Sequence, residues 1–347
     1  TSPLAINQNL TPQTTTLFDI GSSTLNWKDV YINGKLFMNS QLFMHNTGIG
    51  NTFLGANAGT ANTAAVNTFI GADAGASNTT GSSNSFLGNS AGRFNTTGLE
   101  NSFFGQSAGT LNTTGNDNAF FGFNAGGNNS TANNNTFMGS YAGAANTTGA
   151  SNVFMGSNAG QLNNASDNTF IGASAGTDNT SGSSNVFVGK LSGFFNTTAN
   201  NNVFVGASAG FANTTGINNT FIGFSSGQAN TTSTNSTFVG NNAGRNATGG
   251  TNAFFGSASG FATTAGNNNS FFGTNSGQNN TTGFSNTFMG QSAGSANTTA
   301  NNNVVIGANA GDANAPLNNN VLVGGDFSNV NNVHRVAFAR LSEESRH

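Results

Sequence analysis

The 347-residue sequence contains no cysteine, three prolines and one tryptophan, and only 5% of its residues are charged. Without cysteine there is no disulfide and no thiolate metal site. The net charge of −3 gives no electrostatic basis for binding nucleic acid or an anionic membrane. No apolar run approaches the length of a membrane-spanning helix. The three histidines, His45, His334 and His347, show no metal-ligand spacing and no neighbouring nucleophile, so we predict a non-enzymatic protein with no catalytic residue, metal or cofactor.

What the sequence does have is a repeat that begins at Phe53. A large apolar residue, here called the anchor, recurs in 17 copies that are separated by 13 intervals of 17 residues and three intervals of 16. A fixed short period is the signature of a solenoid. The unit is too short, and too rich in Gly, Asn, Ser and Thr, for a helical pair. We therefore predict an all-β protein, a parallel β-solenoid of about 17 coils with 16–17-residue repeats and a length of about 77 Å.

The residue after each anchor is also apolar, so the short strand is apolar on both faces. Because successive side chains point to opposite faces, one face can fill the coil and the other needs a second surface. The chain offers no separate apolar segment for this role, so we expect another copy of it, in an intertwined or side-by-side homotrimer. The predicted core and trimer-interface residues are Phe53, Phe69, Phe86, Phe103, Phe104, Phe120, Phe121, Phe137, Phe154, Phe170, Phe187, Phe204, Phe221, Phe238, Phe254, Phe271 and Phe288.

Glycine occurs two residues after the anchor in every copy and six after it in all copies but the last. Glycine at fixed offsets indicates corners that need positive φ or close backbone approach. The shortened intervals lose a residue between the second glycine and the next repeat, which predicts an outer loop there. The predicted corner glycines include Gly55, Gly71, Gly88, Gly105, Gly122, Gly139 and Gly156.

Asparagine lies two residues before the anchor in all copies but one, where Ser236 replaces it. Stacked in register, these side chains are expected to form amide ladders. A second motif, Asn-Thr-Thr-Gly, as at Asn95 to Gly98, is formally a glycosylation acceptor, but we interpret it as a turn whose threonines cap the backbone. A rank of threonines also leaves open an ice-binding face, although adjacent threonines cannot both lie on one flat surface.

The flanks differ from the repeats, and we predict three parts: residues 1–48, residues 49–325 and residues 326–347. The first part holds an extended polar arm and a β cap with a hairpin signal at Asn33-Gly34, and the last is a charged tail. The start at Thr1 suggests processing, such as signal-peptide removal. We expect the arm or the tail to dock on the next copy, which would join copies head to tail into a filament.

The unit Asn-Thr-Phe-Ile-Gly-x-x-Ala-Gly-x-x-Asn-Thr-Thr-Gly resembles repeats of bacterial tail-fibre-domain proteins and large surface proteins. It is more loosely similar to coils in the heads of trimeric autotransporter adhesins. The segments Asp19 to Ser23 and Trp27 to Tyr31 resemble a motif of phage and bacterial tail-fibre proteins. Such proteins often carry a C-terminal chaperone domain that trimerises the chain and then cleaves itself off before a serine. The end at Glu344-Ser345 would fit that cleavage.

This resemblance implies a homotrimeric, extracellular or cell-surface fibre. Our main hypothesis is therefore a structural shaft that serves adhesion, with itself and an unknown surface receptor or glycan as partners. The alternatives are a phage tail fibre that binds a host receptor, located on the virion, and an ice-binding solenoid.

Overall fold

The computed structural model describes residues 35–38, 41–45, 48–312 and 318–325. The predicted arm, the Trp27 to Tyr31 motif, the Asn33-Gly34 turn and the charged tail lie outside the described residues. Within the described residues all regular structure is β-strand. None of them forms a helix that is long and apolar enough to cross a membrane.

The described chain opens with a hairpin. Strands β1 (Lys35–Met38) and β2 (Gln41–His45) pair antiparallel, and β2 continues antiparallel onto β3. From β3 onward each repeat contributes one three-residue strand, and each strand pairs in parallel with the next, anchor opposite anchor. These strands are β3 (Thr52–Leu54), β4 (Thr68–Ile70), β5 (Ser85–Leu87), β6 (Ser102–Phe104), β7 (Ala119–Phe121), β8 (Thr136–Met138), β9 (Val153–Met155), β10 (Thr169–Ile171), β11 (Val186–Val188), β12 (Val203–Val205), β13 (Thr220–Ile222), β14 (Thr237–Val239), β15 (Ala253–Phe255), β16 (Ser270–Phe272), β17 (Thr287–Met289), β18 (Val304–Ile306) and β19 (Val321–Val323).

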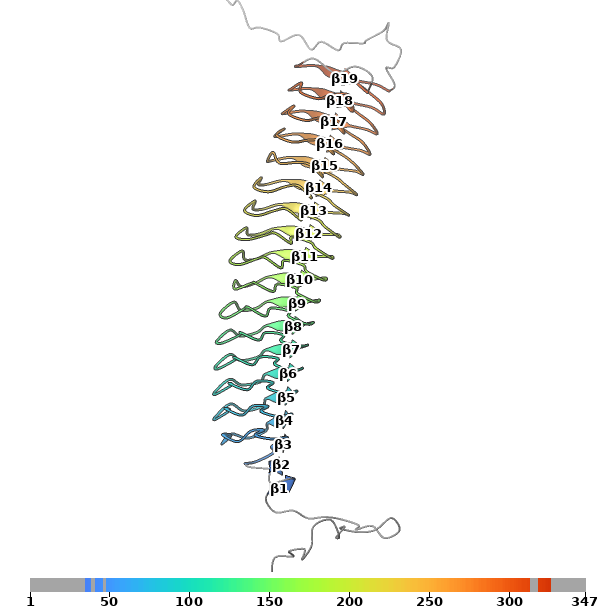
Figure 1. Ribbon diagram of the computed structural model, residues 1–347. Coiled ribbons are helices and arrows are strands. Elements are labelled where there is room, and N and C mark those ends of the chain that lie inside the picture. Colours follow the sequence, from blue (N-terminus) through green and yellow to red (C-terminus); the bar gives the residue numbers. More distant parts are fainter. Residues whose placement is uncertain (1–34, 39–40, 46–47, 313–317, 326–347) are drawn as a thin grey trace, which may run out of the picture.

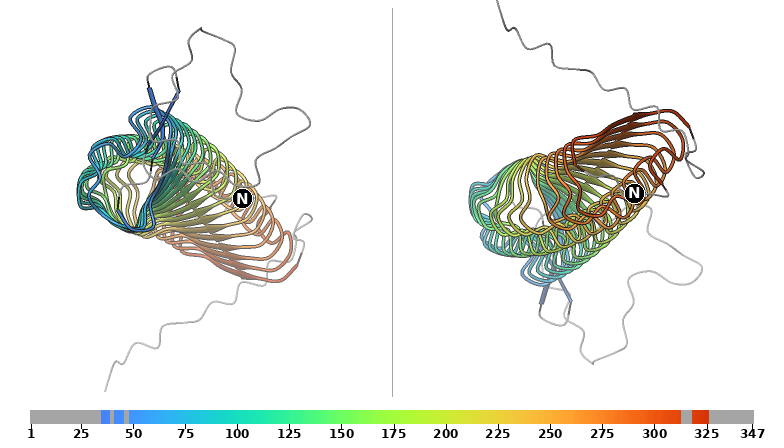
Figure 2. Two further views of the ribbon diagram at one scale, coloured as in Figure 1. Left: turned by 90° about the horizontal axis from the view of Figure 1, so that it is seen from below. Right: turned by 90° about the horizontal axis from the view of Figure 1, so that it is seen from above.

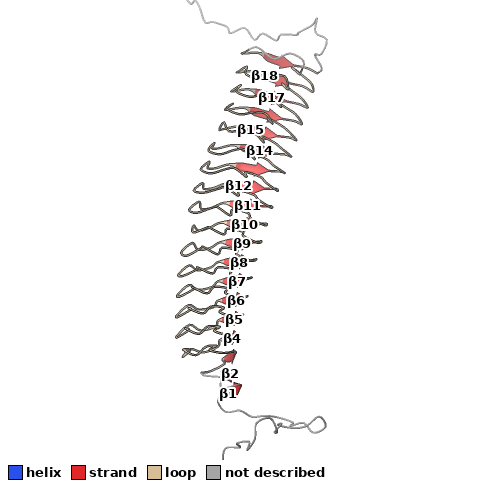
Figure 3. Ribbon diagram, in the orientation of Figure 1, coloured by secondary structure: helices blue, strands red, loops and turns tan. Residues whose placement is uncertain are grey.

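The prediction of an all-β parallel solenoid with one coil per repeat is therefore confirmed. The coils stack into a rod, with the β1–β2 hairpin at one end and β19 near the other (Figure 1). The strands lie one above another along the rod, and the rest of each coil consists of turns (Figure 3). Seen along the axis, each coil is offset from the last, so the stack is twisted (Figure 2), as expected for strands with a right-handed twist.

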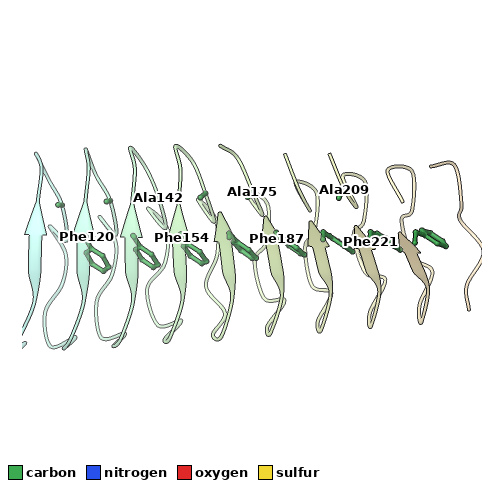
Figure 4. Close-up of a cluster of buried hydrophobic side chains, with 14 of the residues drawn as sticks. Phe120, Ala142, Phe154, Ala175, Phe187, Ala209 and Phe221 are labelled. Atoms are coloured by element: carbon green, nitrogen blue, oxygen red, sulfur yellow. The ribbon is translucent and has the colours of Figure 1, made fainter. Parts of the chain in front are cut away.

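The anchors form an inner column of stacked rings. All 15 anchor phenylalanines are buried, and consecutive ring centroids lie 4.7 to 5.0 Å apart. An alanine or serine five residues after the anchor faces the ring from the returning arc, as Ala142, Ala175 and Ala209 do in Figure 4. Each ring contributes about 1.5–3 kcal/mol by burial, so each coil has a thin but continuous core.

The two glycines of each coil occupy positions that no other residue type fits easily. Gly105 has φ of 139°, and a Cβ there would lie 2.4 Å from the carbonyl oxygen of Gly122 in the next coil. Gly109 has φ of 57°, and a Cβ there would lie 2.4 Å from the ring of Phe103. The first glycine thus lets adjacent coils approach, and the second makes room for the anchor ring.

The asparagines before the anchors, here called strand asparagines, close each coil and also join it to the next. Asn84 donates from Nδ2 to the carbonyl of Gly98 in its own coil at 2.9 Å. Its Oδ1 accepts the backbone N–H of Asn101 in the next coil at 2.9 Å. The expected side-chain ladder is present only in part, since Nδ2 of Asn101 also reaches Oδ1 of Asn84 at 3.2 Å. A buried amide that is bonded in both directions fixes the coil spacing.

A second column holds the asparagines nine residues after the anchors, here called turn asparagines. Nδ2 of Asn112 donates to Oδ1 of Asn95 in the preceding coil at 2.7 Å and to the carbonyl of Gly115 at 3.0 Å. Asn95, Asn112, Asn146 and Asn213 are fully buried. Glycosylation of these amides would require the coil to open, so the turn interpretation of Asn-Thr-Thr-Gly fits the structure. The outer loop is consequently shorter than expected, because it begins only after the turn asparagine.

His45 closes the ring column at the hairpin end. The side chain is buried, its ring centroid lies 4.9 Å from that of Phe53, and its Nε2 lies 2.7 Å from the carbonyl oxygen of Ala58. Because β2 runs antiparallel to β3, His45 lies directly opposite Phe53. This histidine therefore has a packing role at the end of the core.

Candidate assembly surface

The strand residues on either side of each anchor point away from the core, and they form the outer face of the sheet. Each strand from β3 to β18 buries its anchor, and the two neighbours of the anchor are half-buried or exposed. In β19 the anchor Leu322 is only partly buried. We call the apolar residues that follow the anchors the outer column. Its members are Leu54, Ile70, Leu87, Phe104, Phe121, Met138, Met155, Ile171, Val188, Val205, Ile222, Val239, Phe255, Phe272, Met289, Ile306 and Val323.

The outer column is apolar without interruption along the whole described solenoid. Within it the rings of Phe104 and Phe121 stack at 4.9 Å, and those of Phe255 and Phe272 stack at 5.0 Å. Met44 of the hairpin pairs with Leu54 and is 41% exposed, so it extends the column beyond the first coil. A continuous apolar stripe of this length on a polar rod is typical of an interaction surface.

The structure thus divides the predicted core and interface residues into two groups. The 15 anchor phenylalanines, from Phe53 to Phe288, lie inside the coil, where none of them can reach another molecule. Phe104 and Phe121 belong to the outer column and remain half-buried. The corner glycines from Gly55 to Gly156 lie at the turn that follows the strand, each against the backbone of the next coil.

The methionine side chains that the structure describes all lie on this surface. Met44, Met138, Met155 and Met289 are the methionines whose side chains the structure describes, and all four are exposed and point outward beside the strands. Methionine is unbranched and polarisable, so it adapts to irregular apolar neighbours. Methionine in the outer column therefore suits contact with a partner surface whose shape differs from coil to coil.

The threonine rank on the opposite arc is engaged with the backbone. Oγ1 of Thr96 donates to the carbonyl oxygen of Thr113 at 2.9 Å, and the same bond recurs from Thr113 to Ser130 and from Thr197 to Thr214. These hydroxyl groups therefore reinforce the stack, and they do not form a free, regular lattice of donors.

In the part of the chain that the structure describes, no group of three or more His, Asp or Glu side chains lies close enough together to hold a metal ion. The nine charged residues of the repeats are scattered among the coils. The assembly surface is therefore the candidate site that these residues support best.

Sequence reasoning did not find two features. The turn asparagines recur almost as regularly as the strand asparagines, but the Asn-Thr-Thr-Gly motif was interpreted only as a turn capped by its threonines. The second feature is a ridge of bulky residues seven and eight positions after the anchors, which includes Phe194 and Phe195. Its signal was the presence of large side chains at positions where most repeats have Thr, Ala or Gly.

No protein-family model matches this chain, and a search of curated proteins found no match either.

Proposed function

We propose that this protein is the structural shaft of an extracellular fibre, in which three copies pack their outer columns together along a common axis. The observation that carries the proposal is the uninterrupted outer column, from Leu54 to Val323. The column is one side chain wide, which suits three rods that converge on an axis. A two-sheet sandwich would need wider apolar faces.

The thin core of the single rod supports the same proposal. From the Phe53 coil to the Phe288 coil, each coil buries one phenylalanine and one small residue, while the apolar side chain after the anchor remains partly in water. Association would bury this second side chain, with a contribution of about 25 cal/mol for each Å² of apolar area removed from water. Summed over 17 coils, the gain is large enough to hold copies together permanently.

The extracellular location and the adhesive use follow from the resemblance to surface and tail-fibre repeats. A low-charge surface of Asn, Ser, Thr and Gly and the absence of cysteine are compatible with both. Adhesion is the use that we favour, because a rod of about 77 Å extends a binding surface away from a cell.

The mass of the native particle in sedimentation equilibrium tests the assembly. We expect three times the chain mass of 35.0 kDa. Val188→Asp would bring a charge into the interface and should release monomers. Thr97→Asp places the same charge on an exposed outer loop and should leave the particle intact. A wild-type monomer would contradict the proposal.

A cysteine scan tests the register even where a charge variant fails to fold. Because the chain has no cysteine, Val188→Cys introduces a single thiol. In a parallel, in-register particle this residue lies beside its own copies and should form an intermolecular disulfide on mild oxidation. Thr97→Cys is the matched control and should remain reduced. Failure of Val188→Cys to cross-link would exclude an in-register interface.

A further inference from the structure

A second surface feature lies on a different arc of the coil from the outer column. In five consecutive coils the residue seven after the anchor is large, and it is Gln278 in the coil that follows them, whereas it is Thr, Ala or Gly in most of the preceding coils. The backbone stacks these residues directly, since Phe195 N–H donates to the Phe211 carbonyl and Ala229 N–H donates to the Arg245 carbonyl. With one neighbour they make up what we call the aromatic-arginine strip: Phe194, Phe195, Phe211, Gln228, Arg245 and Phe261.

The side chains of the strip contact one another from coil to coil. Phe194 and Phe211 stack with their ring centroids 5.6 Å apart, and Phe195 meets both rings edge-on. Nε of Arg245 donates to Oε1 of Gln228 at 2.8 Å. The Arg245 guanidinium carbon lies 5.8 Å from the centre of the Phe261 ring. The contacts thus form two groups in neighbouring coils, Phe194–Phe195–Phe211 and Gln228–Arg245–Phe261. Together they extend along about 19 Å of the rod, at one coil per 4.8 Å.

The guanidinium of Arg245 is available for a ligand. Among the described residues no carboxylate forms an ion pair with Arg245, and its Nη groups have no partner there. The one acidic residue that borders the strip, Asp178, lies beside Phe194 at its other end. The Arg245 end of the strip thus presents unpaired positive charge between a planar amide and an aromatic ring.

The repeat sequence is also irregular in the coils of Arg245 and Phe261. Ala247 and Thr263 replace the turn asparagine in the two coils that carry Arg245 and Phe261. As a consequence the buried oxygens Asn230 Oδ1 and Thr263 Oγ1 have no hydrogen-bond partner. Sequences usually depart from a stabilising rule where function requires it. The loss of hydrogen bonds coincides with the Arg245 and Phe261 part of the strip, whereas the turn asparagines in the coils of Phe195 and Phe211 keep the ladder.

We propose that the aromatic-arginine strip binds a linear acidic polysaccharide. A guanidinium fork matches a carboxylate, the Gln228 amide can bond sugar hydroxyl groups, and ring surfaces pack against the apolar C–H faces of sugars. A polymer laid along the rod would meet one coil after another. The strip is too narrow to be a stable interface for a second copy, which needs a far larger buried area. The proposal rests on the adhesive use proposed above, but it does not require three copies.

The test measures retention of the native particle on four immobilised polymers: polygalacturonate, alginate, hyaluronate and polysialic acid. We expect binding to at least one of them, weakening as salt is added. Arg245→Gln should lower the affinity by about tenfold or more, since it removes a charged hydrogen bond. Arg93→Gln is the matched control, because Arg93 occupies the same position in an earlier coil and lies over the Phe94 ring. Its affinity should equal that of the wild type.

Three results would overturn the proposal: retention on none of the four polymers, equal affinity of Arg245→Gln and the wild type, or a smaller particle mass for Phe211→Ala. The last result would make the strip a contact between copies. Melting curves of each variant show that it is folded. Particle mass is measured without polymer, and polymer binding is measured by retention. The two measurements therefore distinguish loss of polysaccharide binding from loss of the trimer.

Discussion

Residues 78–213 and residues 230–280 build the same coil with different hydrogen bonds along the rod. In the first segment the turn asparagines form an amide ladder, for example Asn112 to Asn95 at 2.7 Å and Asn196 to Asn179 at 2.6 Å. It has one gap, at Asn146 Oδ1, where the next coil is one residue shorter. In the second segment Ala247 and Thr263 interrupt the ladder, and Nδ2 of Asn230 turns to Oγ of Ser233.

The strand asparagines show why the second segment still folds. Where Ser236 replaces one of them, its backbone N–H still donates to Asn219 Oδ1, and its Oγ accepts the N–H of Asn252 at 3.2 Å. The ring column also continues through Phe238 and Phe254 without a break. The anchors and strand asparagines therefore define the coil. The turn-asparagine ladder adds stability, but the coil still forms where this ladder is interrupted.

The largest effect is expected at the corner glycines, in both segments alike. Gly105→Val and Gly240→Val would each place a Cβ 2.4 Å from the carbonyl oxygen of the next coil, at φ of 139° and 142°. We expect a loss of about 3 kcal/mol or more, measured by chemical denaturation. Thr114→Val, on the exposed outer loop, is the control and should change little. A much smaller loss of stability for Gly240→Val than for Gly105→Val would mean that the coils of the second segment are loosely stacked.

The next effect should appear in the regular segment. Asn112→Ala removes the donor to Asn95 Oδ1 and the acceptor of Asn129 Nδ2, all of them buried. We expect a destabilisation of about 1–3 kcal/mol for the polar groups left unpaired. Amide hydrogen exchange should accelerate in the adjoining coils before distant ones, because repeats couple to nearest neighbours. Uniform acceleration along the rod would contradict this local account.

The reverse substitution should strengthen the interrupted segment. Ala247→Asn would place an amide where Asn230 Oδ1 is buried without a partner. One restored hydrogen bond is expected to add about 1 kcal/mol. The gain would be seen as slower amide exchange around residues 230–264. If the aromatic-arginine strip needs the interruption, the same variant should also bind acidic polymers less well. A stability loss would show that the site cannot accommodate the larger side chain.

The smallest effect concerns Asp178, which lies within the first segment. Burial raises the pKa of this carboxyl above its usual value. The folded chain therefore holds the proton to higher pH than the unfolded chain, and stability declines as the pH rises through the folded-state pKa. Asp178→Asn should remove this decline in a pH series of melting temperatures. A pH profile identical to that of the wild type would exclude Asp178 as its source.

Much of this fold could be read from the sequence, because its strongest signals act within one repeat. The period placed Phe53 to Phe288 in one column, and the glycine offsets placed Gly105 and its equivalents at corners. The prediction was less complete for Asn95 and its equivalents, since an Asn-Thr-Thr-Gly motif has the same composition whether its asparagine faces water or the core. The ridge at Phe194 to Phe261 was also missed, because one bulky residue per repeat shows no pattern until the coils are stacked.

The sequence by itself determined the coil: its length, its apolar anchor, its glycine corners and the strand that pairs with its neighbours in register. These features are local, because steric limits on φ and the alternation of a strand act over a few residues. Only the tertiary structure decided which asparagine oxygen meets which amide, that Phe104 faces outward while Phe103 is buried, and that Gln228 and Arg245 meet. Their partners lie a full coil of 16 or 17 residues away, so the contacts exist only once stacking has fixed the register.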